Sequence, residues 1–278
     1  MPIASAVRDD WVVVLSSSEG PGCERLGGGR GEDANAGTRL GRALERARGI
    51  VPPERVCVVI APQELERGRE PLAALPAENI VEQAQHCGSF FEILRGLLWV
   101  LGRQPSARVI GMPVDPVCQD ERALQESLRR VAGGMARGDD LTLIGMKPIW
   151  PDPDLGYIVP GHRMADGTRR VYRVENRVGI ELARDLVSSG GLWNSGCFVG
   201  RGSALLGMLC AARPKEVHQM QTALACLARP SWRSSALQRL YADLPTLDFA
   251  GVVLQSSEGR LRVLASVPLI DEKTAERI

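Results

Sequence analysis

Short apolar segments alternate with helix-like segments through the first half of the chain. The apolar segments are too short for helices, are bounded by polar or turn residues and predict strands at residues 11–15, 56–61, 79–82, 108–112 and 141–146. Between them, apolar residues recur at helical spacing, which predicts helices at residues 38–48, 89–101 and 121–135, with a helix or turn at 71–75. This alternation is typical of βαβ units and predicts a parallel sheet with helices on both faces. Ligands of such sheets bind at the carboxyl ends of the strands.

The pattern changes after Trp150, where shorter strands are joined by loops. We predict strands at residues 156–160, 170–175, 197–200 and 261–267, and helices at 180–188, 204–212 and 232–240. The chain contains no internal repeat and no low-complexity linker. We therefore expect residues 1–278 to form one domain, with residues 1–150 and 151–278 as its two halves.

Composition excludes several classes of partner. The 278 residues include 34 Lys and Arg against 33 Asp and Glu, so the chain lacks the excess of positive charge that would suggest binding to a nucleic acid. No apolar run has the length of a membrane span, and Asp9 and Asp10 interrupt any signal-peptide pattern at the start. The 7 cysteines are scattered and odd in number, which favours reduced thiols over disulfides or a zinc site. These features predict a cytoplasmic protein that binds neither nucleic acid nor membrane.

Residues 190–200 combine glycines with polar side chains and an aromatic ring. They read Gly-Gly-Leu-Trp-Asn-Ser-Gly-Cys-Phe-Val-Gly, which suggests a tight loop that leads into a strand. Asn194 and Ser195 beside Trp193 would supply hydrogen-bonding groups on an apolar wall, as a sugar-sized ligand requires. The alternative is a hairpin turn whose tryptophan packs in the core.

Four short motifs occur in a characteristic order along the chain. They are Pro-Val-Asp115 after the fourth strand, Gly156-Tyr157-Ile158, Val174-Glu175, and Trp193-Asn194-Ser195-Gly196. In this order the chain resembles the sugar-1-phosphate nucleotidyltransferases, most closely the mannose-1-phosphate guanylyltransferases. Residues 141–158 and 190–198 carry the most specific part of the resemblance, which extends over nearly the whole chain.

The resemblance implies a fold and a reaction. The fold would be α/β and Rossmann-like (GT-A-like), with a mostly parallel central sheet and a small mixed-strand sugar-binding lobe. Residues 1–150 would form the nucleotide-binding half and residues 151–278 the sugar-binding half. The family's reaction joins a nucleoside triphosphate, here with GTP favoured, to a sugar 1-phosphate, and it yields a nucleotide sugar and pyrophosphate with Mg²⁺ as cofactor.

The resemblance also implies roles for individual residues. Catalytic roles fall on Asp115, Asp271 and Arg177, and the two aspartates would bind the metal. The residues implied at the nucleotide are Leu15, Ser16, Ser17, Gly20, Gln83 and Ser89. The residues implied at the sugar are Gly156, Tyr157, Glu175, Asn194 and Ser195.

The chain departs from the family where the triphosphate would be neutralised. Two glycines of the family's first loop are replaced by serines within residues 16–23, and Pro21 removes a backbone donor. Asn176 stands where the family has a lysine, and Arg177 is displaced from that position by one residue. The string Ala-Gly-Thr-Arg-Leu at residues 36–40 resembles the missing signature, but it opens a predicted helix, so we interpret it as coincidence. Each lost electrostatic group costs a rate factor of roughly 10²–10³, which predicts weak or lost activity.

Two other functions stay open at this point. One is a catalytically silent protein that binds a nucleotide sugar or regulates a partner, either a second copy of this chain or a catalytic paralogue. The other is a glycosyltransferase-like protein, for which Asp152 and Asp154 have the spacing of a metal motif but lie in a proline-rich link.

Overall fold

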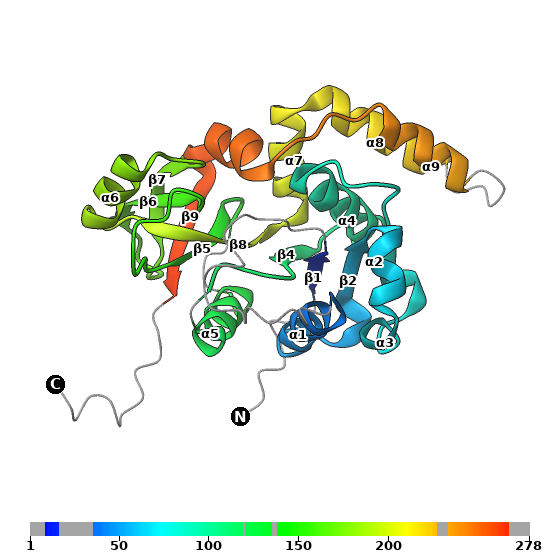
Figure 1. Ribbon diagram of the computed structural model, residues 1–278, viewed down its shortest axis with the longest axis horizontal. Coiled ribbons are helices and arrows are strands. Elements are labelled where there is room, and N and C mark those ends of the chain that lie inside the picture. Colours follow the sequence, from blue (N-terminus) through cyan, green and yellow to red (C-terminus); the bar gives the residue numbers. More distant parts are fainter. Residues whose placement is uncertain (1–8, 17–35, 119, 135–137, 227–232, 267–278) are drawn as a thin grey trace.

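The computed structural model describes residues 9–16, 36–118, 120–134, 138–226 and 233–266. Within them the strands form one nine-stranded sheet with the order β3-β2-β1-β4-β8-β5-β9-β7-β6 (Figure 1). The strands are β1 (Asp10–Leu15), β2 (Val56–Ile60), β3 (Ile80–Glu82), β4 (Arg108–Pro113), β5 (Leu141–Met146), β6 (Tyr157–Arg163), β7 (Arg169–Glu175), β8 (Leu192–Arg201) and β9 (Leu261–Ser266). Each predicted strand is present, most of them with ends shifted by one or more residues.

Helices connect most of these strands. They are α1 (Ala36–Arg48), α2 (Pro62–Arg67), α3 (Arg69–Leu72), α4 (Ser89–Arg103), α5 (Glu121–Ala132), α6 (Ile180–Ser188), α7 (Gly202–Ala212), α8 (Pro214–Cys226), α9 (Arg233–Ala242), the short 3-10 helices η2 (Pro53–Arg55), η3 (Ala77–Asn79) and η6 (Gln255–Arg260), and the π-helix η5 (Ala250–Leu254). Helix α8 was not predicted, although Val217, Met220 and Leu224 have helical spacing and contribute to the core.

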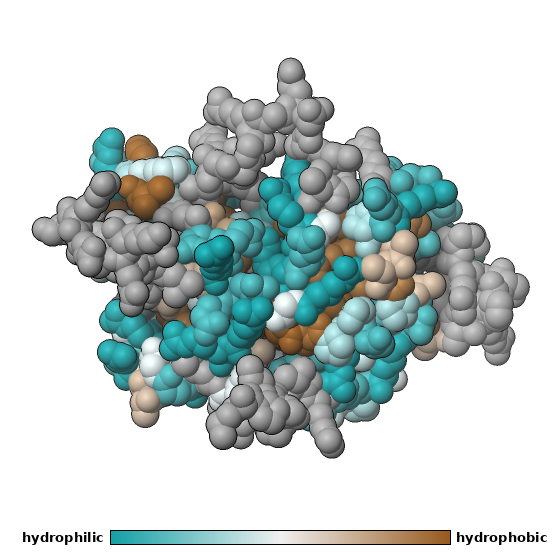
Figure 2. Space-filling view, turned by 90° about the horizontal axis from the view of Figure 1, so that it is seen from below, coloured by the Kyte–Doolittle hydropathy of each residue, from teal (hydrophilic) through white to brown (hydrophobic). Residues whose placement is uncertain are grey.

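The sheet separates two hydrophobic cores because the side chains of a strand alternate between its faces. On β1, Trp11, Val13 and Leu15 belong to the core that α4, α7 and α8 cover. Val12 and Val14 belong to the core on the opposite face, which α1, α5 and α6 cover. Figure 1 shows α1 and α5 on one side of the sheet and α4 and α7 on the other, and Figure 2 shows the α1 and α5 side as mostly hydrophilic around a hydrophobic band.

The sheet is mixed, which corrects the expectation of a mostly parallel one. Strands β1, β2, β3 and β4 are parallel neighbours, as are β5 and β9, but β8 runs antiparallel to both β4 and β5. The reason lies in where β8 enters the sheet: its Trp193 pairs with Met146, at the carboxyl end of β5. The chain thus returns from the β6–β7 region at the carboxyl edge and must run in the opposite direction.

The Trp-Asn-Ser-Gly segment lies inside β8 rather than in a loop before it. From Leu143 to Gly145 on β5, the partner on β8 moves from Phe198 to Asn194, so β8 bulges here by two residues. Gly196 supplies the positive φ of 82° within this bulge. The bulge brings Asn194 to the carboxyl edge of the sheet while both flanking parts of β8 stay paired.

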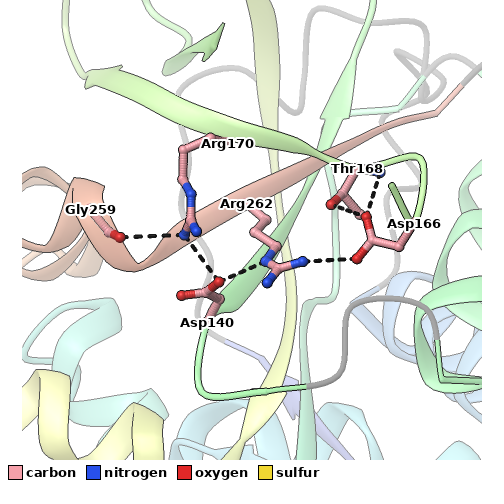
Figure 3. Close-up of polar contacts among 6 residues, drawn as sticks. All are labelled: Asp140, Asp166, Thr168, Arg170, Gly259 and Arg262. Atoms are coloured by element: carbon pink, nitrogen blue, oxygen red, sulfur yellow. Dashed lines mark hydrogen bonds and ion pairs between the residues drawn. The ribbon is translucent and has the colours of Figure 1, made fainter. Parts of the chain in front are cut away.

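A network of charged residues joins β5, β7 and β9 near the start of β5 (Figure 3). Arg262 on β9 donates through Nε to Asp140 at 2.7 Å and through Nη1 to Asp166 at 2.8 Å. Arg170 on β7 also donates to Asp140, at 3.0 Å, and to the carbonyl of Gly259, at 3.3 Å. The network holds the β6–β7 hairpin against β9.

The described residues bear on two expectations from the sequence, the absence of membrane spans and the reduced state of the cysteines. None of their helices is long and apolar enough to cross a membrane. The described cysteine side chains are all free thiols, at Cys57, Cys87, Cys118, Cys197 and Cys210.

Asp10 is a buried carboxylate at the start of β1, with 1% of its surface exposed. Burial raises the pKa of Asp10 to about 6, although Arg108, 3.6 Å away, acts in the opposite direction. The folded state therefore binds the carboxyl proton of Asp10 more tightly than the unfolded state does. The contribution of Asp10 to the free energy of unfolding is lost as the pH rises from about 4 to about 6.

We therefore expect Asp10→Asn to stabilise the protein at pH 7.5, by about 1–2 kcal/mol. The difference from wild type should shrink as the pH falls toward 4, because Asp10 then becomes neutral in the folded state. Urea unfolding at pH 4.5, 6 and 7.5 measures it, with the exposed Asp243→Asn as a control that should change stability little. An equal gain at all three pH values would contradict the assignment to Asp10.

Candidate functional site

A cavity of about 320 Å³ opens at the carboxyl ends of β1 and β4. Its walls come from both halves of the chain: the first turn of α4, the segment after β4, the start of β8, the turn after β7, and residues 246–250 with Leu254. Seven of the residues implied by the resemblance line it, namely Leu15, Ser89, Asp115, Gly156, Arg177, Asn194 and Ser195. Parallel strands place their ligand sites at this edge.

Asn194 and Gly156 form part of the wall that residues 151–278 contribute to this cavity. The backbone N–H of Asn194 donates to the carbonyl of Gly156 at 2.8 Å. The side-chain Oδ1 of Asn194 accepts from the N–H of Gly196 at 3.0 Å, which closes the bulge. The amide oxygen therefore shapes the wall, and the Nδ2 group is the part of this side chain left to contact a ligand.

Ser195 and Tyr157 use their hydroxyls inside the fold. Ser195 Oγ donates to the carbonyl of Ile144 at 2.7 Å and accepts from the N–H of Cys197 at 3.1 Å. Tyr157 is fully buried, and its hydroxyl donates to the carbonyl of Asp152 and accepts from the same residue's N–H. Tyr157 does not line the cavity, which corrects its expected place at the sugar: it belongs to the core on the α5 and α6 face.

The turn after β7 brings Arg177 but not Glu175 to the cavity. Glu175 Oε1 lies 2.7 Å from Nε of Arg173, so this carboxylate pairs within its own strand. Arg177 has a φ of 55°, the left-handed region that few residues other than glycine adopt. Backbone strain of this kind is held by surrounding structure and occurs often at binding sites.

Asp248 fastens three segments together at the cavity wall. It accepts hydrogen bonds from Ser89 Oγ at 3.0 Å, from Asn176 Nδ2 at 2.8 Å and from the N–H of Gly251 at 2.8 Å. Ser89 Oγ in turn accepts from the N–H of Phe249 at 2.9 Å. The hydroxyl of Ser89 is therefore committed to joining α4 to η5, although the residue lines the cavity.

Four carboxylates line the cavity, and sequence analysis assigned a catalytic and metal-binding role to only one of them, Asp115. Besides Asp115 they are Glu92, Asp154 and Asp248, and Glu92 is 1% exposed. Glu92 interrupts the otherwise apolar run of residues 90–94, and this interruption is the sequence signal that could have marked it as a candidate site residue. Asp152, the partner of Asp154 in the spacing of a metal motif, is buried, and its Oδ1 accepts from the N–H of Asp154.

Asp115 contacts an arginine that sequence analysis set aside. Its Oδ2 lies 3.1 Å from Nη1 of Arg39, which belongs to the Ala-Gly-Thr-Arg-Leu string. That string does open α1, as expected, and does not follow a strand directly. The fold nevertheless carries Arg39 to the carboxyl end of β4.

The remaining expected nucleotide residues are placed elsewhere or are not described. Gln83 is fully buried, and its N–H donates to the carbonyl of Ile60. Ser16 donates through its hydroxyl to Glu64 and through its N–H to the carbonyl of Val59, and neither Ser16 nor Gln83 lines the cavity. Ser17, Gly20 and Asp271 lie outside the described residues.

Comparisons with known proteins bear on what this cavity could bind. No protein-family model matches the chain. It is 30% identical over 138 residues to the xanthan biosynthesis protein XanB of Xanthomonas campestris, a match covering 49% of this chain and 27% of XanB. A putative mannose-1-phosphate guanylyltransferase of Vibrio cholerae is 26% identical over 118 residues, covering 42% of this chain and 25% of that protein. These matches relate part of this chain in sequence to XanB and to a protein named as a putative mannose-1-phosphate guanylyltransferase.

The fold agrees with this relationship. A crystal structure described as mannose-1-phosphate geranyltransferase from Thermus thermophilus superposes with a TM-score of 0.72 at 21% identity, covering 93% of this chain and 74% of that one. The matches to XanB and to the Vibrio cholerae protein span only about a quarter of those relatives' lengths.

The Mg²⁺ site that the resemblance implies rests on Asp115 and Asp271, and the described part of the chain includes only Asp115. Within it, no group of three or more His, Cys, Asp or Glu residues could hold a metal ion. The carboxylate of Asp115 already contacts a guanidinium, and its expected partner Asp271 is not described. A divalent cation at Asp115 would have to share that carboxylate with a permanent positive charge.

Proposed function

We propose that this chain binds a nucleotide sugar in the cavity and transfers nucleotide from a triphosphate weakly or not at all. The observation that carries the proposal is the asymmetry of the cavity. The wall on the sugar-binding side, with Gly156 and Asn194, has the backbone and side-chain arrangement to orient a hydroxylated ligand. The names of the relatives favour GDP-mannose as the first ligand to test.

The charges of the described lining support the second part of the proposal. Four carboxylates and one arginine, Arg177, line the cavity, and Arg39 pairs with one of those carboxylates, so the described charges are net negative and disfavour a triphosphate. A nucleotide sugar carries a smaller negative charge on its pyrophosphate, which lowers this repulsion. The second candidate function is an active mannose-1-phosphate guanylyltransferase that uses GTP and Mg²⁺, which the name of the Vibrio cholerae relative favours.

Calorimetric titration with GDP-mannose and with GTP, each in the presence of Mg²⁺, tests the proposal together with a pyrophosphate-release assay. We expect GDP-mannose to bind at least about tenfold more tightly than GTP, and we expect no pyrophosphate above background from GTP and mannose 1-phosphate. Turnover, or tighter binding of GTP, would establish the second candidate function instead.

Asn194→Asp sharpens this test because it keeps the acceptor for the N–H of Gly196. It replaces the amide's donor with a fifth carboxylate at the cavity, so we expect GDP-mannose to bind at least about tenfold more weakly. Gln219→Glu adds the same charge on the exposed face of α8, away from the cavity, and should leave the dissociation constant unchanged. Equal affinities for wild type and Asn194→Asp would place the ligand elsewhere.

A further inference from the structure

A second hollow lies on the surface between α4 and α8, two helices that cover the same face of the sheet (Figure 1). It shares no lining residue with the cavity at the carboxyl ends of the strands, although the first turn of α4 belongs to that cavity. The residues around this α4–α8 hollow include Arg95, Trp99, Gly102, Arg103, Gln221 and Leu224. Among the described residues no carboxylate lines it, so the charge of its lining is positive.

Helical spacing explains how the α4–α8 hollow forms. Arg95, Trp99 and Gly102 follow one another at intervals of four and three positions, so they lie along one face of α4. Gln221 and Leu224 are three positions apart on α8 and line the other side. A Cβ at Gly102 would meet nothing within 4 Å, so the space beside this residue is open. The glycine thus leaves room for a ligand between the two helices.

Arg95 has a guanidinium that no described residue pairs with through a hydrogen bond or an ion pair. Its Nε is buried and makes no hydrogen bond in the described part of the chain. Burial lowers the pKa of Arg95, although Tyr241, Cys57 and Glu82 act in the opposite direction. Buried polar groups of folded proteins nearly always have a partner. An anion bound in the hollow would supply one for Arg95.

Arg103 adds a second positive charge at the rim of the hollow. Its Cζ lies 3.5 Å from the centroid of the Trp99 ring, so the guanidinium stacks on the indole. Stacking uses the face of the guanidinium and leaves the N–H donors in its plane for hydrogen bonds. Planar arginine donors match the oxygens of a phosphate, and such charge-assisted hydrogen bonds are among the stronger ones in proteins.

We propose that the α4–α8 hollow binds a small organic phosphate, with its phosphate group at Arg95 and its apolar part against Leu224. Two positive charges favour a phosphate, which carries nearly two negative charges at neutral pH, over a carboxylate, which carries one. The apolar lining favours a phosphate joined to a carbon skeleton over the free ion. This inference does not depend on what the cavity at the strand ends binds.

Titration with phenyl phosphate, followed through the indole N–H of Trp99 in ¹⁵N-TROSY spectra, tests the proposal at the hollow itself. The chain has 5 tryptophans, and the signal that Trp99→Phe removes identifies Trp99. We expect its shift to saturate below about 20 mM phenyl phosphate at constant ionic strength. Inorganic phosphate and benzoate should each bind at least about threefold more weakly, and phenol, which lacks the negative charge, should give no saturable shift.

Arg95→Met removes the charge and keeps a long apolar side chain, so we expect phenyl phosphate to bind at least about tenfold more weakly. Arg122→Met on α5 is the matched control, since this exposed arginine lies on the opposite side of the sheet and should leave the dissociation constant unchanged. Gly102→Leu keeps both arginines and fills the open space, so it should also weaken binding. It decides the question if Arg95→Met loses the remaining wild-type signals.

The proposal is overturned if the Trp99 signal shows no saturable shift, if phenol binds as tightly as phenyl phosphate, or if inorganic phosphate or benzoate does. It is also overturned if Arg95→Met binds as wild type, or if Arg122→Met loses as much affinity as Arg95→Met, which would indicate unspecific attraction. Arg177→Met removes the arginine of the other cavity. Loss of phenyl phosphate binding in that variant alone would place the phosphate there and would likewise overturn the proposal.

Discussion

Gly88→Ala is expected to lower the free energy of unfolding by about 2–4 kcal/mol and to abolish ligand binding at the cavity. Gly88 has a φ of 89°, which strains any residue with a β-carbon. A Cβ at this position would lie 2.1 Å from the carbonyl oxygen of Leu247 and 2.9 Å from its nitrogen. These are backbone atoms, so no side-chain rotation relieves the overlap.

Leu247 cannot move away cheaply, because hydrogen bonds hold it on both sides. Its N–H donates to the carbonyl of Cys87 at 3.0 Å, and its carbonyl accepts from the N–H of Phe90 at 3.1 Å. Displacing this segment would break those bonds and move a wall of the cavity. Urea unfolding and titration with GDP-mannose measure the two effects.

Gly102→Ala is the matched control for this prediction. Gly102 lies in α4, the helix that Gly88 precedes as its N-cap, and a Cβ at Gly102 meets nothing within 4 Å. Alanine should stabilise the helix by about 0.5–1 kcal/mol and leave the cavity unchanged. If Gly88→Ala were as stable as Gly102→Ala, the close approach of Leu247 would be disproved.

Arg262→Ala is expected to destabilise the protein by about 2–3 kcal/mol. The substitution leaves Asp140 and Asp166 without their shared partner in the network of Figure 3, and Arg262 itself is only 15% exposed. Arg184→Ala removes an exposed pair with Glu181 on α6 and should change stability by less than about 0.5 kcal/mol. Urea midpoints of the two variants and wild type provide the comparison.

The effect of Arg262→Ala should depend on pH in a defined direction. Partial burial tends to raise the pKa of Asp166, but hydrogen bonds from Thr168 and the charge of Arg262 outweigh it and hold the pKa below its usual value. Stability from this carboxylate is present at neutral pH and is lost as the pH falls through the folded-state pKa. The difference between wild type and Arg262→Ala should therefore shrink below about pH 4, and a difference independent of pH would exclude this origin.

Local patterns were sufficient for the strands but not for their directions. Helices cover both faces of the sheet, so a strand such as residues 11–15 is apolar on both of its faces. Such continuous apolar runs could be located in the sequence from their composition alone. The direction of β8 depends on its entry at the carboxyl edge beside Met146, which is a long-range property of the chain. Helix α8 was missed because only a narrow stripe around Val217 and Met220 is apolar.

The candidate site was predictable where motifs are contiguous. Gly156 and Asn194 both line the cavity, since short segments specify their local backbone, and their contact with a sugar stays a prediction. The pairing of Arg39 with Asp115 could not be read from the sequence, because it joins side chains that only the folded sheet brings together. Tyr157 was misplaced because a motif does not reveal which face of its strand each residue occupies.

The position of β8 between β4 and β5 also has a consequence for synthesis of the protein. Strands β4 and β5 leave the ribosome before their shared neighbour, residues 192–201, has been made, and β9, the other neighbour of β5, follows only at residues 261–266. Until then the hydrogen-bonding edges of these apolar strands are open to incorrect pairing. The edges of β4 and β5 that β8 covers in the folded protein therefore stay unpaired while residues 147–191 are made.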